Sequence, residues 1–161
     1  MEEALIAVVE IPGGSRNKYE IDKTTGEIFL DRTLFTATRY PADYGYFPET
    51  LAEDGDPLDA LVLVTEPTFP GCRIRVRPIG IFLMEDDGDA DHKVISVPIA
   101  DPRWSDVNDV GDLDSHFRDE IEHFFQVYKQ LEDTKTATIG WRSIEETWPI
   151  IATARAAYPG V

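Results

Sequence analysis

Short runs of hydrophobic residues alternate with clusters of turn-forming residues along the first two-thirds of the chain. Val, Ile, Phe and Tyr are frequent within the runs, and Gly, Pro and Asp separate them, which is typical of β-strands joined by turns. The pattern predicts strands over residues 4–11, 18–22, 27–32, 60–64, 73–84 and 93–99. Short strands at this spacing favour a closed or nearly closed β-barrel.

A helical period replaces the strand pattern later in the chain. Apolar residues from Leu113 to Leu131 recur every three or four positions, which places them on one face of an amphipathic helix. We expect Asp112 or Asp114 to cap the start of this helix by accepting free backbone N–H groups. The chain is therefore predicted to be mainly β, with helices added late.

A second helix is predicted near the end of the chain. Ser143 and Glu146 have the spacing of a capping box, which indicates a helix running towards Ala157. Pro149 lies inside this segment and should kink or shorten the helix, because proline lacks the backbone N–H and clashes with the preceding turn.

Composition limits the class of protein. The 161 residues, 42% of them hydrophobic, suit one globular domain over 1–161 rather than a disordered chain. A net charge of -16 argues against binding to a nucleic-acid backbone, which requires basic patches. No apolar run is long enough for a membrane span, and one cysteine without a leader segment favours the cytoplasm.

Two acidic clusters lie beside predicted strands. The first is DGDPLD, which contains Asp54, Asp56 and Asp59, and the second is EDDGDADHK, which contains Asp86 and Asp91. Both clusters can be explained as turns, since Asp-Gly and Asp-Pro favour turns and Asp-Gly is common in two-residue hairpins. Neither has the ligand spacing of an EF-hand calcium loop. If both face one cavity, their carboxylates suit magnesium, which commonly shares its coordination with substrate phosphates.

Cations and tyrosines with phosphate-binding chemistry accompany these clusters. Lys18, Arg32, Lys93 and Lys129 are isolated basic residues in strands or at the end of a helix, and each alone can be a surface charge. The tyrosines of RYPADYGYFP can donate to phosphate oxygens, although packing in the core is their ordinary role. Together with the carboxylates, the four cations outline a site for a small, highly charged anion bridged by metal ions.

These motifs resemble the soluble family I inorganic pyrophosphatases of bacteria and archaea. The similarity runs from EIPGGSRNKYEID through DRTLFTATRYPADYGYFPETL, DGDPLD, the RPIG strand, EDDGDADHKVISVP, DVND and HFFQVYKQLE to GW. DGDPLD with an upstream YPADYGY is close to diagnostic of the family. The segment after YK departs from the pattern, because Lys135 is its one base where relatives commonly have more lysines.

The resemblance implies an OB-like closed β-barrel with flanking helices that hydrolyses pyrophosphate with several magnesium ions. Manganese or zinc are possible substitutes, and calcium is expected to inhibit. By resemblance, Asp54, Asp59 and Asp91 hold the principal metal, Asp59 helps to bridge to a second, and Asp86 with Asp91 takes a metal that arrives with substrate. Glu10 is expected in the same metal-binding group. Members usually assemble as hexamers, so a homo-oligomer is expected.

The resemblance also assigns roles in catalysis. Asp56 is expected to orient and deprotonate the attacking water, while Lys18 and Tyr44 grip the phosphoryl group under attack. The leaving phosphate would be held by Arg32, Tyr128 and Lys129, and the surrounding shell organised by Glu20 and Lys93. Two rival hypotheses remain at this point: a metal-dependent hydrolase of nucleotides, and a non-catalytic calcium-binding β-module. The second rival leaves the four cations unexplained.

Overall fold

The computed structural model describes residues 4–160, so residues 1–3 and 161 of the predicted domain lie outside the described residues. The strands are β1 Leu5–Ile11, β2 Asn17–Ile21, β3 Ile28–Thr33, β4 Asp43–Tyr46, β5 Asp59–Val62, β6 Arg73–Asp86, β7 Asp89–Ala90, β8 Lys93–Pro98 and β9 Thr136–Arg142. The helices are α1 Ser115–Val127 and α2 Ile144–Ala157, with short 3-10 turns η1 Pro102–Trp104 and η2 Val110–Asp112. No helix within residues 4–160 combines the length and apolarity needed to cross a membrane.

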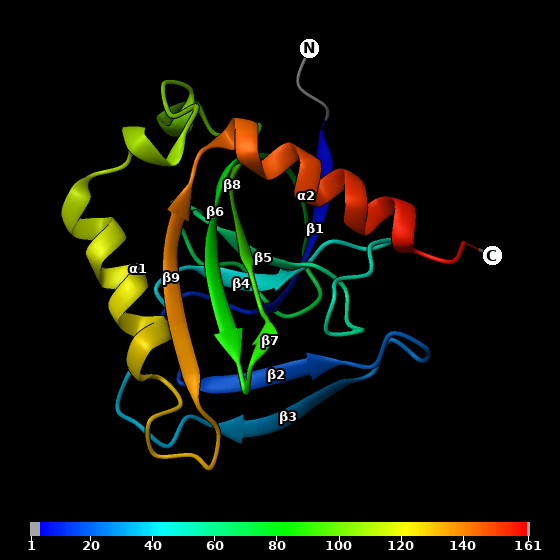
Figure 1. The fold of residues 1–161 in the computed structure, drawn as a ribbon, viewed down its shortest axis with the longest axis vertical. Helices are drawn as coiled ribbons and strands as arrows, with labels where there is room; N and C mark the ends of the chain where they lie inside the picture. The colour runs from blue at the N-terminus through cyan, green and yellow to red at the C-terminus, as the bar shows by residue number, and fades with distance from the viewer. Residues whose placement is uncertain (1–3, 161) are drawn as a thin grey trace.

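The main sheet closes on itself in a ring (Figure 1). β1 pairs with β4, β4 with β5, β5 with β8, β8 with β6, and β6 returns to β1. β7 and β9 extend from β6, whereas β2 and β3 form a separate hairpin. A five-stranded closure of this kind is OB-like. The predicted mainly β fold with flanking helices is confirmed.

The long strand β6 makes this closure possible, because its first residues pair with β1 and the following ones with β8; its second half also pairs with β9. Its pairing with β8 shifts register between Pro78 and Gly80. A Cβ atom at Gly80 would lie 2.4 Å from a Val110 methyl group and 2.8 Å from the Arg142 carbonyl oxygen. Glycine is therefore required where η2 and β9 approach this irregularity in β6.

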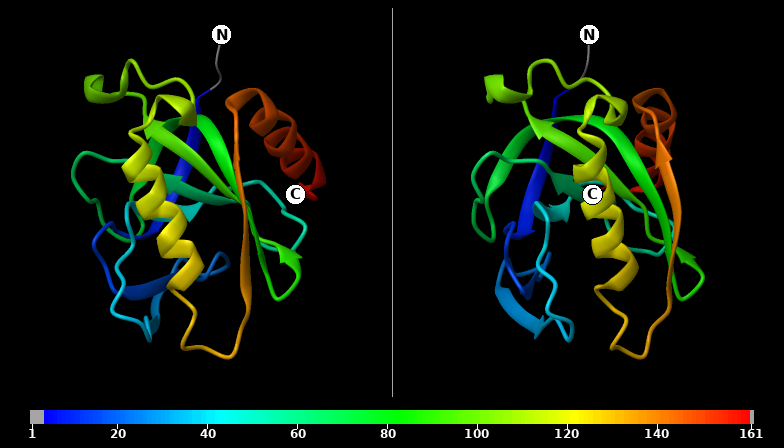
Figure 2. Two further views of the ribbon diagram at one scale, coloured as in Figure 1. Left: turned by 60° about the vertical axis from the view of Figure 1, so that its left-hand side comes forward. Right: turned by 90° about the vertical axis from the view of Figure 1, so that its left-hand side faces the viewer.

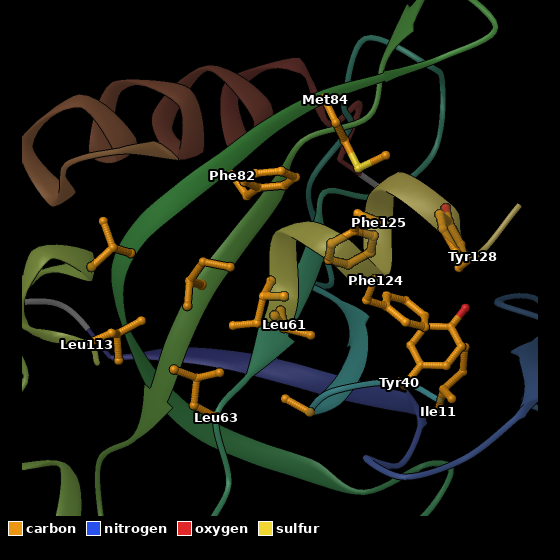
Figure 3. Close-up of a cluster of buried hydrophobic side chains, with 14 of the residues drawn as sticks. Ile11, Tyr40, Leu61, Leu63, Phe82, Met84, Leu113, Phe124, Phe125 and Tyr128 are labelled. Atoms are coloured by element: carbon orange, nitrogen blue, oxygen red, sulfur yellow. The ribbon is translucent and has the colours of Figure 1, made fainter. Parts of the chain in front are cut away.

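The two larger hydrophobic cores among residues 4–160 lie on the two faces of the ring. Figure 3 shows the inner core, where Leu61 and Phe82 of the sheet pack with Phe124 and Phe125 of α1. The outer core lies under α2 and includes Ala60 and Val62 of β5 with Ile151 and Ala154 of α2. Figure 2 shows α1 and α2 on different sides of the ring. The run ALVLV is continuously apolar because alternate side chains enter the two cores.

All six predicted strands are present, but the sequence pattern missed β4, β7 and β9. α1 is shorter than predicted: it ends at Val127, and Leu131 is exposed. Asp114 occupies the N-cap position but makes no capping hydrogen bond with its side chain. Asp112 does not cap α1 either, because its Oδ2 atom accepts from the backbone of Asn108 and Asp109. The capping prediction was therefore wrong in its detail.

The second helix forms with the predicted capping box of Ser143 and Glu146. The expectation that Pro149 would shorten it was wrong, because α2 continues to Ala157. Pro149 lacks only the N–H that would reach the carbonyl of Glu145 in the exposed first turn, where water can replace that bond.

Candidate active site

A cavity of about 430 Å³ lies where β1, β2, β4, β5, the β6–β7 turn and the end of α1 meet. Twelve of the thirteen residues expected from the family resemblance line this cavity, and Arg32 is the exception. The twelve are Glu10, Lys18, Glu20, Tyr44, Asp54, Asp56, Asp59, Asp86, Asp91, Lys93, Tyr128 and Lys129. Segments far apart in the sequence thus contribute to a single polar site.

Strand register explains the centre of the site. The parallel pairing of β5 with β8 places Asp59 directly beside Lys93, and β4 places Tyr44 opposite Leu61. Because side chains alternate along a strand, Asp59 and Leu61 share a face, and Asp91, between β7 and β8, contacts Lys93 directly. The polar groups therefore continue the inner face of the ring beyond its aromatic core.

Lys93 connects these groups and is almost fully buried, with its side chain 1% exposed. Its Nζ donates to Tyr44 Oη at 2.7 Å, to Asp59 Oδ2 at 2.8 Å and to Asp91 Oδ1 at 2.7 Å. Tyr44 Oη in turn donates to Asp59 Oδ2 at 2.9 Å. One buried ammonium group thus holds two carboxylates and a tyrosine in fixed positions.

Burial and charge shift the pKa values of this group in different directions. Burial raises the pKa of Asp59 to about 7, against the opposing charge of Lys93. Burial also opposes ionisation of Asp91, but the charge of Lys93, the hydrogen bonds with Asp59 and Lys93 and the charge of Lys129 together outweigh it and lower the pKa of Asp91. Although burial disfavours the charged amine, the two carboxylates raise the pKa of Lys93, so it stays protonated. This group therefore combines a fixed cation, Lys93, with the carboxyl group of Asp59, which ionises with difficulty.

The DGDPLD segment completes the loop between β4 and β5 and ends at Asp59, the first residue of β5. Asp54 Oδ1 accepts from the backbone N–H of Asp56 at 3.0 Å, and Gly55 between them has a φ of 87°, which glycine adopts readily. Both Asp54 and Asp56 line the cavity. Burial raises the pKa of Asp54. The turn interpretation therefore holds for Asp54, and it does not compete with a role in the cavity.

The second acidic cluster is a hairpin that carries two cavity residues. Asp87 and Gly88 form a two-residue loop with φ values of 49° and 85°, the combination expected for a type I′ turn. Asp86, before the loop, accepts from Lys129 Nζ through Oδ2. Its Oδ1 is buried and has no partner in the described structure. This carboxylate thus retains an oxygen that can accept a further donor or a cation.

The β2 side of the cavity contains a cation that the sequence analysis missed. Lys23 lines the cavity, lies 4.4 Å from the ring centre of Tyr46 and donates to Glu10 Oε2 at 3.2 Å. The same Glu10 oxygen accepts from the backbone N–H of Ile21 at 2.8 Å. Lys23 follows directly on YEID, so its position one residue beyond a predicted strand was the available signal. Glu10 is engaged with β2 and with Lys23 in this structure.

The carboxylates in the cavity have the chemistry to bind a divalent cation, although in this structure Lys93 contacts two of them. Within residues 4–160, no three Asp, Glu, His or Cys side chains converge closely enough to hold a metal ion. Lys93 Nζ contacts one oxygen of each carboxylate, Asp59 Oδ2 and Asp91 Oδ1. Hard oxygen donors of this kind suit magnesium. The unpartnered oxygen of Asp86 and the raised pKa values of Asp54 and Asp59 agree with a site that gains positive charge when a ligand binds.

Comparison with known proteins identifies the family. A model described as inorganic pyrophosphatase matches residues 7–159. The inorganic pyrophosphatase of Leifsonia xyli subsp. xyli is 54% identical over 145 residues, which cover 89% of each chain. That of Streptomyces coelicolor is 57% identical over 128 residues, which cover 80% of this chain and 78% of the relative. The crystal structure of inorganic pyrophosphatase from Thermus thermophilus superposes with a TM-score of 0.94 at 45% identity and covers 98% of this chain and 92% of that one. With the fold, the cavity and these similarities in agreement, the chain belongs to the inorganic pyrophosphatase family.

Proposed function

We propose that this protein hydrolyses inorganic pyrophosphate to two phosphates with magnesium ions as cofactors. The observation that carries the proposal is the single cavity in which carboxylates, lysines and tyrosines face one another. Apart from Ile11, Pro57 and Ala90, every lining residue is charged, a tyrosine or a threonine. Such a lining suits a compact polyanion with cations and provides no apolar pocket for a nucleobase.

The proposed metal ligands are Asp54, Asp59 and Asp91, with Asp86 added when substrate brings a further ion. When bound, magnesium neutralises phosphoryl oxygens and lowers the pKa of water. Glu10 supports the site from β1, and its contacts with Ile21 at the end of β2 and with Lys23 already fix its position. Manganese or zinc would substitute for magnesium, whereas calcium would bind with looser geometry and inhibit.

The chain's own residues orient the reactants. Asp56 lies at the cavity edge and takes the proton of the attacking water, which requires a carboxylate within hydrogen-bonding reach. Lys18 and Tyr44 hold the phosphoryl group under attack, and Lys93 fixes Tyr44 through its 2.7 Å hydrogen bond. The leaving phosphate is held by Tyr128 and Lys129, which directly follow α1, together with Arg32 from β3. Glu20 supports Lys18 from the same strand. Charge stabilisation of this kind dominates phosphoryl transfer.

We also propose that the enzyme is cytoplasmic and assembles as a homohexamer. Consecutive apolar side chains of β3 are exposed: Ile28 by 47%, Phe29 by 55% and Leu30 by 57%. An exposed apolar strand supports contact with a second copy, which would remove this surface from water. The one cysteine of the chain, Cys72, agrees with a reducing compartment. Light scattering after gel filtration should give close to six times 18.1 kDa, and a stable active monomer would contradict the assembly.

The test of the function is phosphate release from pyrophosphate and from ATP, each with magnesium, with calcium or without metal. We expect rapid release from pyrophosphate with magnesium, slow release from ATP, and little release with calcium or without metal. Comparable rates on both substrates would favour the nucleotide hydrolase. Binding of calcium without hydrolysis of either substrate under any condition would favour the calcium-binding module.

A further inference from the structure

Arg32 is held outside the cavity lining by two carboxylates. Its Nη1 contacts Asp31 Oδ2, and its Nη2 lies 2.9 Å from Glu132 Oε1. Glu132 belongs to the loop between α1 and β9, far from Arg32 in the sequence, and its side chain is 11% exposed. Burial lowers the pKa of Arg32, but the hydrogen bond and charge of Glu132, with those of Asp31, outweigh it and raise the pKa. The guanidinium group therefore stays charged and has a defined orientation.

The same region contains most of the unsatisfied polar atoms of the structure. Among residues 4–160, seven buried side-chain nitrogen or oxygen atoms lack a hydrogen-bond partner. Four of them belong to Arg32, Asp86 and the loop between α1 and β9, which together we call the wall: Arg32 Nε, Glu132 Oε2, Thr134 Oγ1 and Asp86 Oδ1. Asp86 and Thr134 line the cavity, as does Lys129, which contacts Asp86. Buried polar groups without partners are costly, so their concentration here indicates a wall that gains partners when a ligand binds.

Backbone contacts make this wall continuous. The N–H of Asp87 donates to the carbonyl of Lys135 at 2.8 Å, and the N–H of Lys135 donates to Asp87 Oδ1 at 2.9 Å. The loop that carries Glu132 is thereby attached to the β6–β7 turn at one end and follows α1 at the other. The loop therefore holds Glu132 in a fixed position beside Arg32.

We propose that Glu132 is a positioning residue that fixes the guanidinium plane of Arg32 for contact with a phosphate group of the substrate. This inference rests on the proposed pyrophosphatase function. A guanidinium group has five N–H donors in a rigid plane, and Asp31 and Glu132 use one on each terminal nitrogen. The remaining donors include the buried Nε–H, which has no partner in the described structure, and the contacts with Asp31 and Glu132 fix the plane in which all of them lie. Without Glu132, the long side chain samples other rotamers and binds the anion less well.

The test is a double-mutant cycle with two readouts. Binding of methylenediphosphonate, a pyrophosphate analogue that cannot be hydrolysed at its P–C–P bridge, is measured by calorimetry with saturating magnesium, and KM and kcat are measured with pyrophosphate. We expect Glu132→Ala to weaken analogue binding and raise KM about tenfold, and Glu132→Gln, which retains an acceptor, about threefold. In an Arg32→Ala background, either substitution should change binding by less than about twofold, because the group that Glu132 positions is gone.

The control is Asp133→Ala, which removes a charge from the exposed neighbouring position in the same loop. We expect it to leave binding within about twofold of the parent. Three results would each overturn the proposal. The first is an equal effect of Glu132→Gln with and without Arg32, and the second is an effect of Asp133→Ala as large as that of Glu132→Ala. The third is tighter binding after loss of Glu132. A parent that binds the analogue but does not hydrolyse pyrophosphate would refute the function instead. The Gln variant keeps the test valid if the Ala variant does not fold.

Discussion

Replacing Lys93 with methionine should destabilise the folded protein. The side chain is 1% exposed, and its Nζ contacts Tyr44 Oη, Asp59 Oδ2 and Asp91 Oδ1 at 2.7, 2.8 and 2.7 Å. Methionine fills similar space without charge and leaves two buried carboxylates side by side. Removing one partner of a buried ion pair costs about 3–5 kcal/mol. For a chain of this length, that corresponds to a fall of roughly 6–20 °C in melting temperature.

The loss should depend on pH, and its sign follows from the carboxyl groups. Without Lys93, burial and mutual repulsion raise the pKa values of Asp59 and Asp91 in the folded state above their unfolded values. A carboxyl group with a raised folded-state pKa contributes its full stability below the unfolded value of about 3.9 and loses it as pH rises through the folded value. Lys93→Met should therefore be close to the parent at pH 5 and much less stable at pH 8.

Magnesium should partly reverse this loss, because a cation between the carboxylates supplies the missing charge. The measurement is thermal unfolding of parent and variant at pH 5 and pH 8, with and without magnesium. Lys135→Met is the matched control, since Lys135 is exposed and its hydrogen bonds with Asp87 are made by its backbone. The same fall at both pH values, or no greater stabilisation by magnesium than in the parent, would refute the reasoning.

Three further predictions concern the carboxylates and the sheet. Asp56→Asn should lower turnover by about 10²–10⁴-fold at every magnesium concentration, whereas Asp54→Asn should recover as magnesium is raised; identical magnesium titrations would contradict these separate roles. Burial raises the pKa of Asp59 to about 7, so the magnesium concentration that gives half-maximal thermal stabilisation should rise as pH falls below that value. The same pH dependence of this magnesium concentration in Asp59→Asn would be inconsistent with the assignment. Gly45→Ala would place a Cβ atom 1.8 Å from the backbone oxygen of Val8, so urea unfolding should show a loss of at least about 1–3 kcal/mol, and an unchanged midpoint would contradict the close strand contact.

Strands and helices with strong local signals were predictable from the sequence. β-Branched and aromatic runs located β1, β5, β6 and β8, and the capping box located the start of α2. The Asp-Gly pair also marked a hairpin that the structure contains, since its two residues adopt positive φ. These features depend on neighbouring residues, so a local pattern is sufficient to reveal them.

Of the three main-sheet strands that were missed, β7 has two residues, and β4 and β9 have weak local signals. β4 is four residues long and includes Asp43 and Gly45, and β9 has exposed residues at alternate positions and contains Gly140. Both become strands through pairing with distant partners, β4 with β1 and β5, and β9 with β6. Tertiary pairing therefore overrode a poor local propensity.

For the site, the sequence alone determined the kinds of chemistry present: two acidic clusters, isolated cations and tyrosines, and through them the family. Only the tertiary structure decided which groups meet. It placed Asp59 beside Lys93 through the parallel register of β5 and β8, and it turned Arg32 towards Glu132 rather than into the cavity lining. Register and burial depend on contacts between residues that are distant in the chain, and these contacts also set the pKa of Asp59. A linear sequence names the charged groups, whereas the folded chain fixes their partners and their protonation.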